Sequence, residues 1–223
     1  QSFVPLLKWI LALWSPNQQK LVLAMDASSL KKLFVVLSIS VVYRGCAIPI
    51  AWTILREGQK GSWKEPWLRL FKGLQGSTPA DWLVIVAADR GLYARWLYEA
   101  IQGCGWHPLL RINLRSKYRP KGDADFRPMS QLLPCPGSVW AGKVTCFAVN
   151  SVEGTLLACW GTNHLEPWII LTDLPPEHAS AAWYGMRSWI EDSFKDLKSD
   201  GWQWQNTRMS DPDRAARLWL ALA

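Results

Sequence analysis

The sequence predicts an α/β fold in which a mixed sheet, flanked by helices, carries a β-rich insertion before the last long helix. Three observations lead to this class. Apolar, β-branched runs alternate with segments of helical period along residues 21–112. Short β-like pieces separated by Pro and Gly follow at residues 113–172, without helical period. A helical pattern resumes after Pro175 and Pro176 and is predicted to run to about Lys198.

Three β-rich runs open the predicted sheet, and a helix follows them. The runs cover residues 21–26, 33–42 and 46–55, and the short connections between them predict an antiparallel arrangement. Over residues 62–74, large apolar side chains recur at spacings of three and four, which is the period of an amphipathic helix.

A strand, a helix and a further strand come next. Residues 82–89 form a near-continuous apolar run, as expected of a central strand that is buried on both faces. Residues 92–102 have a helical pattern that stops at glycines, and residues 106–112 predict the fifth strand. This order of elements is that of the ribonuclease H-like fold, which has a mixed five-stranded sheet flanked by helices.

The chain is expected to form one catalytic core with an insertion. Residues 21–112 and 173–223 make up the predicted core, and residues 113–172 the β-rich insertion subdomain. We interpret residues 1–20 as the remnant of an upstream helical region, and the last predicted helix, which begins near Asp211, as cut off by the chain end.

Composition indicates which kind of partner the protein binds and whether its cysteines are oxidised. A chain of 223 residues that is 49% hydrophobic can bury a sizeable core, and a net charge of +7 suits an anionic partner such as nucleic acid. The apolar runs are too short to cross a bilayer, so no membrane partner is expected. Five cysteines without a CxxC pair predict reduced, mostly buried thiols rather than a zinc site or disulfides: Cys46, Cys104, Cys135, Cys146 and Cys159.

Asp26 and Asp89 each end an apolar run that is predicted to be a strand. The carboxyl ends of strands border the crevice in which open α/β sheets bind ligands, so the two carboxylates converge if their strands are neighbours. Acids at strand ends are also common as turn or helix-cap residues, and for either aspartate alone that interpretation stays open.

A third acid lies on the predicted helix of residues 183–198. At about 100° per residue, four side chains fall within an arc of roughly 60°: Tyr184, Arg187, Glu191 and Lys198. The apolar stripe beside them would pack on the sheet and leave their edge facing the site. The alternative is an ordinary surface row, with Arg187 and Glu191 as an i,i+4 salt bridge.

These residues resemble a known family. The spacing Tyr184-x2-Arg187-x3-Glu191-x6-Lys198 is similar, gap for gap, to the YREK signature of the insertion-sequence-four family of DDE transposases. The segments MDAS (25–28) and ADRG (88–91) resemble that family's two acidic motifs, and the β-rich insertion is also similar. The resemblance covers about residues 20–223.

The resemblance implies a DNA transposase catalytic domain of the cut-and-paste type, which hydrolyses phosphodiester bonds at transposon ends and joins the ends to target DNA. It implies that Asp26, Asp89 and Glu191 hold two Mg²⁺ ions, for which Mn²⁺ can substitute, and that Tyr184, Arg187 and Lys198 contact DNA phosphates. A homodimer in a synaptic complex and a bacterial, nucleoid-associated, cytoplasmic location are expected.

Two other functions stay open: a ribonuclease H-like nuclease without strand transfer, and an inactive, domesticated DNA-binding remnant. A run of cations at the start of the insertion is equally compatible with phosphate contacts and with a solvated loop: Arg111, Arg115, Lys117, Arg119 and Lys121. No GxSxG, GxGxxG or GxxxxGK[ST] motif supports a serine hydrolase, a dinucleotide site or an NTP site.

Overall fold

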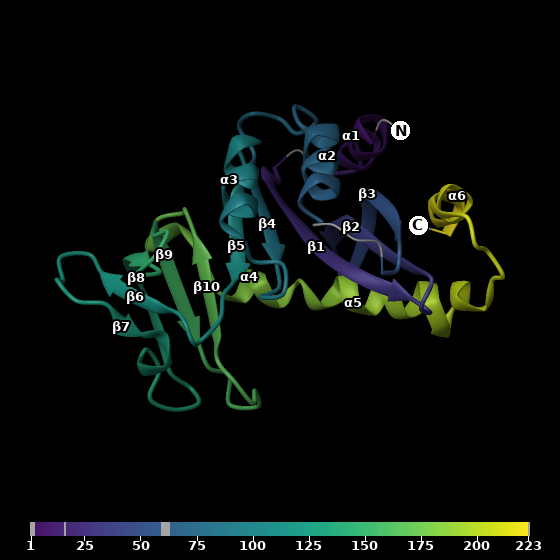
Figure 1. The fold of residues 1–223 in the computed structure, drawn as a ribbon. Coiled ribbons are helices and arrows are strands. Elements are labelled where there is room, and N and C mark those ends of the chain that lie inside the picture. The colour runs from purple at the N-terminus through teal and green to yellow at the C-terminus, as the bar shows by residue number, and fades with distance from the viewer. Residues whose placement is uncertain (1–2, 16, 59–62, 223) are drawn as a thin grey trace.

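A mixed sheet of ten strands forms the centre of the computed structural model, which describes residues 3–15, 17–58 and 63–222 (Figure 1). The strands are β1 (Lys20–Leu30), β2 (Phe34–Tyr43), β3 (Cys46–Arg56), β4 (Leu83–Ala88), β5 (His107–Arg111), β6 (Lys117–Pro120), β7 (Arg127–Pro128), β8 (Val139–Cys146), β9 (Val152–Cys159) and β10 (Trp168–Thr172). Their spatial order is β3-β2-β1-β4-β5-β10-β9-β8-β6-β7. β2 lies between β1 and β3 and is antiparallel to both, as the predicted antiparallel arrangement of successive strands requires, whereas β1, β4 and β5 run parallel.

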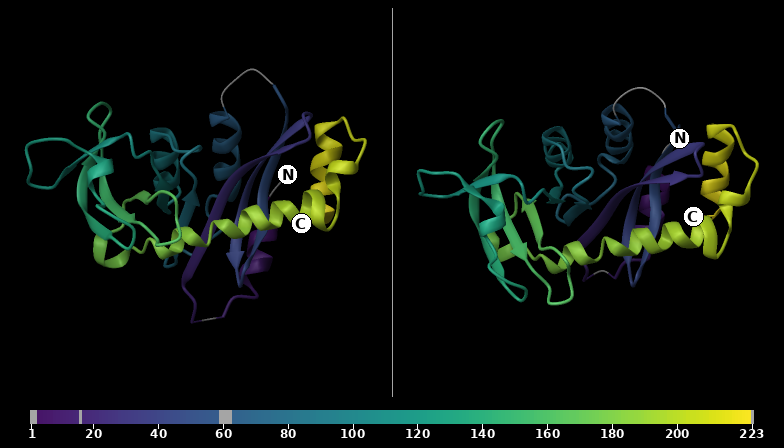
Figure 2. Two further views of the ribbon diagram at one scale, coloured as in Figure 1. Left: turned by 90° about the horizontal axis from the view of Figure 1, so that it is seen from below. Right: turned by 60° about the horizontal axis from the view of Figure 1, so that its bottom comes forward.

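The helices pack on both faces of the sheet. They are α1 (Val4–Leu11), α2 (Lys64–Leu74), α3 (Arg95–Gly103), α4 (Ala182–Gly185), α5 (Ser188–Lys195) and α6 (Pro212–Leu222), with short 3₁₀ turns at Met129–Gln131, Pro176–His178 and Trp204–Asn206 and a π-helical turn at Asp196–Asp200. Figure 2 shows α5 crossing the side of β1 and β2 that lies away from α2 and α3. Among the described residues, no helix has the length and apolarity that a membrane span requires.

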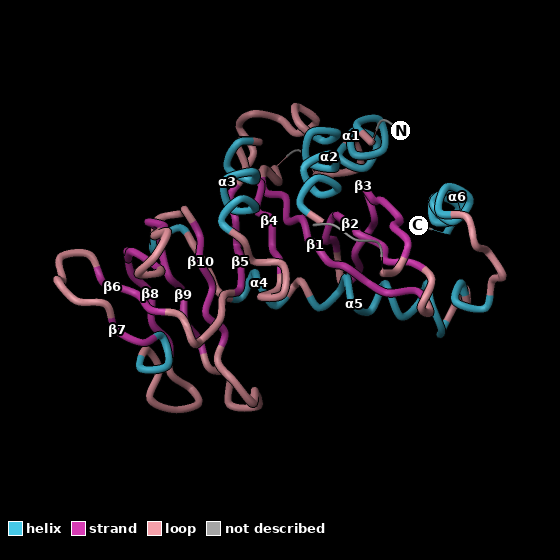
Figure 3. Tube along the Cα trace, viewed as in Figure 1, coloured by secondary structure: helices cyan, strands magenta, loops and turns pink. Residues whose placement is uncertain are grey.

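The expected five-stranded sheet is wrong in size. β10 pairs antiparallel with β5, at Leu110–Leu171 among other positions, and so joins the predicted insertion to the same sheet. A physical reason is that β5 would otherwise be an edge strand, with a row of unpaired backbone N–H and C=O groups. The strands and loops of this region stand out in Figure 3, where one end of the molecule is coloured almost entirely as strand and loop.

β1 is longer than its apolar run suggested. It extends to Leu30, so Asp26 lies inside the strand rather than at its end. The antiparallel partner β2 pairs with β1 from Leu23 to Leu30, and this pairing keeps β1 extended after its parallel partner β4 has ended. Periodicity in a single segment cannot reveal how far a neighbouring strand reaches.

Successive side chains of β1 point to opposite faces of the sheet and pack into two separate hydrophobic cores. Leu21, Leu23 and Met25 belong to the core beneath α1, α2 and α3, whereas Val22 and Ala24 belong to the core beneath α5 and α6. Both cores are closed by large side chains, with Trp67 and Phe71 of α2 on the first face and Phe194 and Trp219 on the second. The sheet is thereby buried on both sides between the helix layers.

The long helix predicted up to Lys198 is interrupted. Between α4 and α5 the backbone tightens into bonds that span three residues: the N–H of Arg187 donates to the carbonyl of Tyr184 at 3.0 Å, and the N–H of Ile190 donates to that of Arg187 at 3.1 Å. A 3₁₀ segment turns by more per residue than an α-helix does, so α4 and α5 do not form one regular helix. Tyr184 in α4 is buried, while Glu191 in α5 is exposed.

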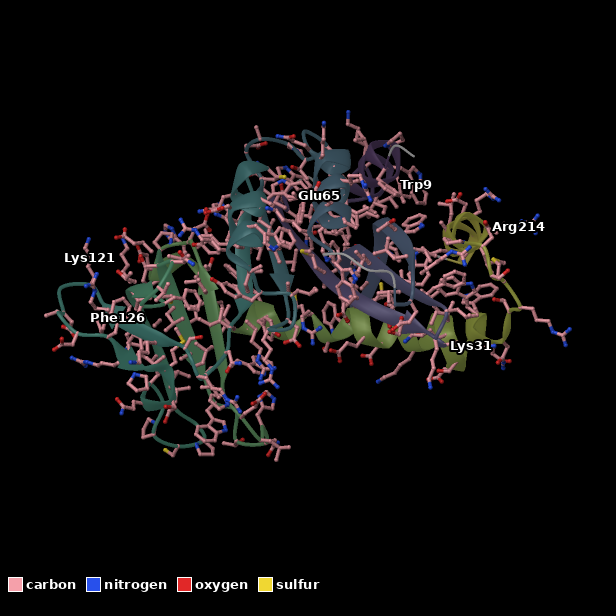
Figure 4. The ribbon with its side chains drawn as sticks, in the orientation of Figure 1. Trp9, Lys31, Glu65, Lys121, Phe126 and Arg214 are labelled. Atoms are coloured by element: carbon pink, nitrogen blue, oxygen red, sulfur yellow. The ribbon has the colours of Figure 1, made fainter. Side chains whose placement is uncertain are left out.

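The five cysteines are free, but the expectation that most are buried is wrong. Only Cys146 is buried, Cys46 and Cys135 are exposed, and the other two are half-buried. Cys46 and Cys135 also mark distant parts of the chain, since the first begins β3 and the second lies in a loop before β8. The molecule is elongated, as Figure 4 shows with Lys121 and Arg214 at opposite ends.

Candidate active site

Asp26 lies in β1, and Asp89 directly follows β4, the parallel neighbour of β1. The ladder between β1 and β4 ends at the pair Met25–Ala88, so the two acids are the next residues on each chain segment. Asp26 shares the face of Ala24, which packs beneath α5. Asp89 continues the face of Ala87, whose core includes Tyr184. Both carboxylates are therefore presented to the side on which α4 and α5 lie.

Arg187 joins Asp26 to the third acid. Its Nη1 lies 3.8 Å from Oδ2 of Asp26, and its Nη2 donates a hydrogen bond to Oε1 of Glu191. The i,i+4 salt bridge of the alternative interpretation is thus present, but it is not an ordinary surface pair, because the Arg187 side chain is only 11% exposed. The guanidinium lies between two acids that are 165 residues apart in sequence.

The charge on Asp26 is disfavoured by its surroundings. Burial raises its pKa above the ordinary value, and the negative charges of Glu191 and Asp89 act in the same direction. The backbone N–H of Ala27, which donates to Oδ1 at 2.8 Å, and the nearby Arg187 offset only part of this effect. This end of the site therefore favours an added positive charge.

Asp89 is held in its ionised form. Its Oδ1 accepts a hydrogen bond of 2.8 Å from the hydroxyl of Tyr184, whose ring packs edge-on against Trp168 at 5.1 Å. Burial acts to raise the pKa of Asp89, but the N–H that follows it, the Tyr184 hydroxyl and two nearby arginines outweigh that effect and lower the pKa. Burial also raises the pKa of Tyr184, so its hydroxyl remains a donor.

Lys198 approaches the same edge from the π-helical turn. Its Nζ donates to the backbone carbonyl of Ser29 at 3.1 Å. Together with Asp26 and Glu191 it lines a pocket of about 300 Å³ beside β1. Burial lowers the pKa of Lys198, while the charge of Asp26 acts against that change.

The donor atoms of the three acids suit a divalent ion. Mg²⁺ prefers carboxylate oxygens, and a bound cation would favour the ionised form of Asp26, whose pKa is raised mainly by burial. In the described part of the chain, however, no three His, Cys, Asp or Glu side chains are grouped as a metal-binding set. Arg187 already supplies a cation between Asp26 and Glu191. The metal role of the acids therefore stays a prediction, and it requires Arg187 to move.

Two charged neighbours of Asp89 were not identified as site residues from the sequence. Arg90 follows Asp89 directly, and its place next to an acid at a strand end could have indicated a site residue. Glu166 lies in the loop before β10, where no motif or periodicity marks it. Arg111, a member of the cationic run at the start of the insertion, lies 3.6 Å from Asp89 and 2.6 Å from Glu166.

The fold and the site define an α/β protein with a charged edge, where acids from two parallel strands and a helix meet arginine and lysine side chains. The family model of the transposase DDE domain matches residues 64–223, more than half of the chain, and the chain therefore belongs to this family. Membership implies a transposition-related nuclease that acts on DNA, and transposases of this kind generally use divalent metals. The match includes Asp89 and Glu191 but begins after Asp26.

Other comparisons add little. Among solved structures, the crystal structure of human ENDOV matches with 11% sequence identity and a TM-score of 0.37, covering 90% of this chain and 82% of that chain. A likeness of this size establishes neither the fold nor the activity of the chain. No curated protein matches the sequence.

Proposed function

We propose that the chain is the catalytic core of a DNA transposase of the insertion-sequence-four kind, built on a ribonuclease H-like fold. The observation that carries the proposal is the register of β1 and β4, which brings Asp26 beside Asp89 on the side facing Glu191. The strand order β3-β2-β1-β4-β5 and the directions of these strands also fit a ribonuclease H-like core. The spacing from Tyr184 to Lys198 supports the narrower assignment.

In this proposal Asp26, Asp89 and Glu191 hold Mg²⁺ or Mn²⁺. A bound pair of such ions supplies activation of the attacking water or 3′-hydroxyl and stabilisation of the leaving oxygen. The protein residues prepare the site: Tyr184 orients Asp89 and favours its ionised form. Arg187 offsets the charges of Asp26 and Glu191 until it moves away from them.

Arg187 and Lys198 then contact DNA phosphates near the bond that is cut. A guanidinium suits a phosphate because it donates two parallel hydrogen bonds, whereas an ammonium acts as a compact charge. Both side chains already lie at the site. Lys198 lines the pocket beside β1, and Arg187 lies between Asp26 and Glu191. Tyr184 contacts DNA in this scheme only if its bond to Asp89 breaks, and otherwise acts as a positioning residue.

Nicking of supercoiled plasmid DNA in Mg²⁺ or Mn²⁺ tests the catalytic assignment. We expect Asp26→Asn, Asp89→Asn and Glu191→Gln each to lower the nicking rate at least about 100-fold. Loss of a residue that only hydrogen-bonds a metal ligand already lowers metal affinity or activity roughly 10–100-fold, and loss of a ligand itself should lower activity at least as much. Asp192→Asn is the matched control, since Asp192 is the exposed neighbour of Glu191 and pairs with Lys195. Near-normal nicking by any of the three variants, with its fold intact, would remove that acid from the catalytic set.

A joining assay separates the proposal from its two alternatives. Transfer of a labelled duplex with a free 3′-hydroxyl into a plasmid supports a transposase, and cutting without joining indicates a nuclease without strand transfer. DNA binding without either reaction indicates an inactive remnant. Covalent crosslinking of the protein in the presence of DNA measures the proposed homodimer in a synaptic complex.

A further inference from the structure

We propose that Arg90 and Arg111 form a second phosphate-binding site beside Asp89, and that Glu166 occupies this site until DNA displaces it. The inference rests on the proposed function only in that the incoming anion is a DNA phosphate. Arg90 Nη1 lies 2.8 Å from Oε1 of Glu166, and Arg111 Nη2 lies 2.6 Å from the same oxygen. One carboxylate thus pairs with two guanidinium groups, whose combined positive charge exceeds its own negative charge.

The sheet explains why these groups meet next to the catalytic edge. The parallel ladder of β4 and β5 ends at Ala88–Leu110, so Asp89 and Arg111 are the next residues on neighbouring strands. Arg111 Nη1 accordingly lies 3.6 Å from Oδ1 of Asp89. Glu166 arrives from the other side, in the loop that leads into β10, the strand paired with β5. Acids and cations therefore alternate along one edge of the sheet.

The contacts of Glu166 have the chemistry of a phosphate site. Two arginines converge on one oxyanion, and arginine forks match the oxygens of carboxylate and phosphate groups equally well. The Arg111 side chain is only 14% exposed, which limits the directions in which it can donate, whereas Glu166 is 41% exposed and can swing away into solvent. Leu165, the neighbour of Glu166, is fully exposed, so the Leu165 side chain does not hold Glu166 in place.

A DNA phosphate competes well with Glu166 for this site. An ion pair that is partly open to solvent contributes little, so its loss is a small penalty for DNA binding. A phosphate that replaces Glu166 comes with its neighbours on the same strand, and these gain contacts with the other cations of the edge. Removal of the Glu166 charge should therefore strengthen DNA binding, and the gain should depend on Arg90 and Arg111.

Fluorescence anisotropy with a labelled duplex of arbitrary sequence tests this in EDTA, where no metal-dependent cleavage interferes. We expect Glu166→Gln to tighten binding about two- to tenfold, in proportion to the modest strength of the ion pairs that it removes. Glu99→Gln is the matched control, because it removes the same charge from an exposed pair with Arg95 within α3. We expect that control to change the affinity less than about 1.5-fold, given charge screening over roughly 10 Å.

Double variants decide whether the effect passes through the two arginines. In Arg90→Gln and Arg111→Gln backgrounds, the gain from Glu166→Gln should shrink, since residues of one charge network couple. A gain equal to that of Glu99→Gln, or a gain that survives in both arginine backgrounds, overturns the inference. If the wild-type chain fails to bind the duplex at all, it is the proposed function that fails. If it binds but Glu166→Gln has no effect, only the phosphate site is wrong.

Discussion

Arg187 shows how one side chain combines a local and a long-range contact. Its partner Glu191 is one helical turn away and could be foreseen from spacing alone. Its approach to Asp26 could not, because that contact depends on α5 packing across β1. The neighbours of Asp89 divide in the same way, since Arg90 follows it in sequence and Glu166 comes from a distant loop. Side chains that meet through tertiary packing leave no periodic signal in the sequence.

Replacement of Arg187 should expose the repulsion among the acids. We expect Arg187→Gln to lower the free energy of unfolding by about 1–2 kcal/mol without metal, since hydrogen bonds to charged groups contribute roughly 1.5–3 kcal/mol and Glu191 is partly solvated. Millimolar Mn²⁺ or Ca²⁺ should then raise the melting temperature more for this variant than for the wild type, because no guanidinium has to be displaced.

Arg95→Gln is the control for this experiment, because Arg95 forms an exposed i,i+4 pair with Glu99. It should change the free energy of unfolding by no more than about 0.5 kcal/mol, with the same metal response as the wild type. Equal metal stabilisation of the wild type and Arg187→Gln would contradict the idea that Arg187 and a metal ion compete for one place.

Individual elements were foreseen where one segment carries its own pattern. The helices α2 and α3 and the strand β4 follow from apolar spacing, and Pro212 after Asp211 marks the start of α6. There the Oδ1 of Asp211 accepts the N–H of Arg214 at 2.8 Å, as a helix cap does. The break between α4 and α5 was not predicted, because no proline interrupts the segment.

Alanine substitution at Gly185 of α4 and at Gly154 of β9 should have opposite effects on stability, because the space around the two residues differs. A Cβ on Gly185, at the end of α4, would meet only the Trp168 ring at 3.7 Å, which is an ordinary contact. We expect Gly185→Ala to stabilise the protein by about 0.4–1 kcal/mol, because alanine reduces the freedom of the unfolded chain. A Cβ on Gly154 of β9 would lie 2.6 Å from the Thr172 carbonyl and 3.0 Å from the Tyr98 hydroxyl.

Gly154→Ala should therefore destabilise the protein by about 1–3 kcal/mol, the usual penalty for overpacking. Urea denaturation of the two variants beside the wild type measures both effects. If Gly154→Ala were neutral, β9 and β10 would have to be packed less closely than the structure shows, and if Gly185→Ala were destabilising, the α4 backbone would have to differ.

At the scale of the whole molecule, the class of fold and the presence of a β-rich segment were predictable, but the continuity of the sheet was not. Local patterns identified the short strands after residue 113, yet they carry no information on which edge they join. The joining is decided by backbone pairing between β5 and β10 and by a core shared across the junction. That core contains Leu97 and Ile101 of α3 together with Leu156 of β9.

A shared core and an unbroken sheet predict that both halves of the molecule unfold together. Two exposed thiols allow this to be measured: Cys135 reports on the β-rich end, and Cys46 reports on the other end of the sheet at β3. A fluorophore is attached to Cys135 in a Cys46→Ser variant and to Cys46 in a Cys135→Ser variant, and each protein is unfolded in urea. Labelling sites are confirmed by peptide mapping, because Cys104 and Cys159 are half-buried.

We expect the two urea midpoints and slopes to coincide with each other and with those of the loss of far-UV circular dichroism, as for a cooperative unit. An earlier transition at Cys135, with a smaller slope, would mean that the β-rich end opens alone and that the β5–β10 pairing adds little to its stability.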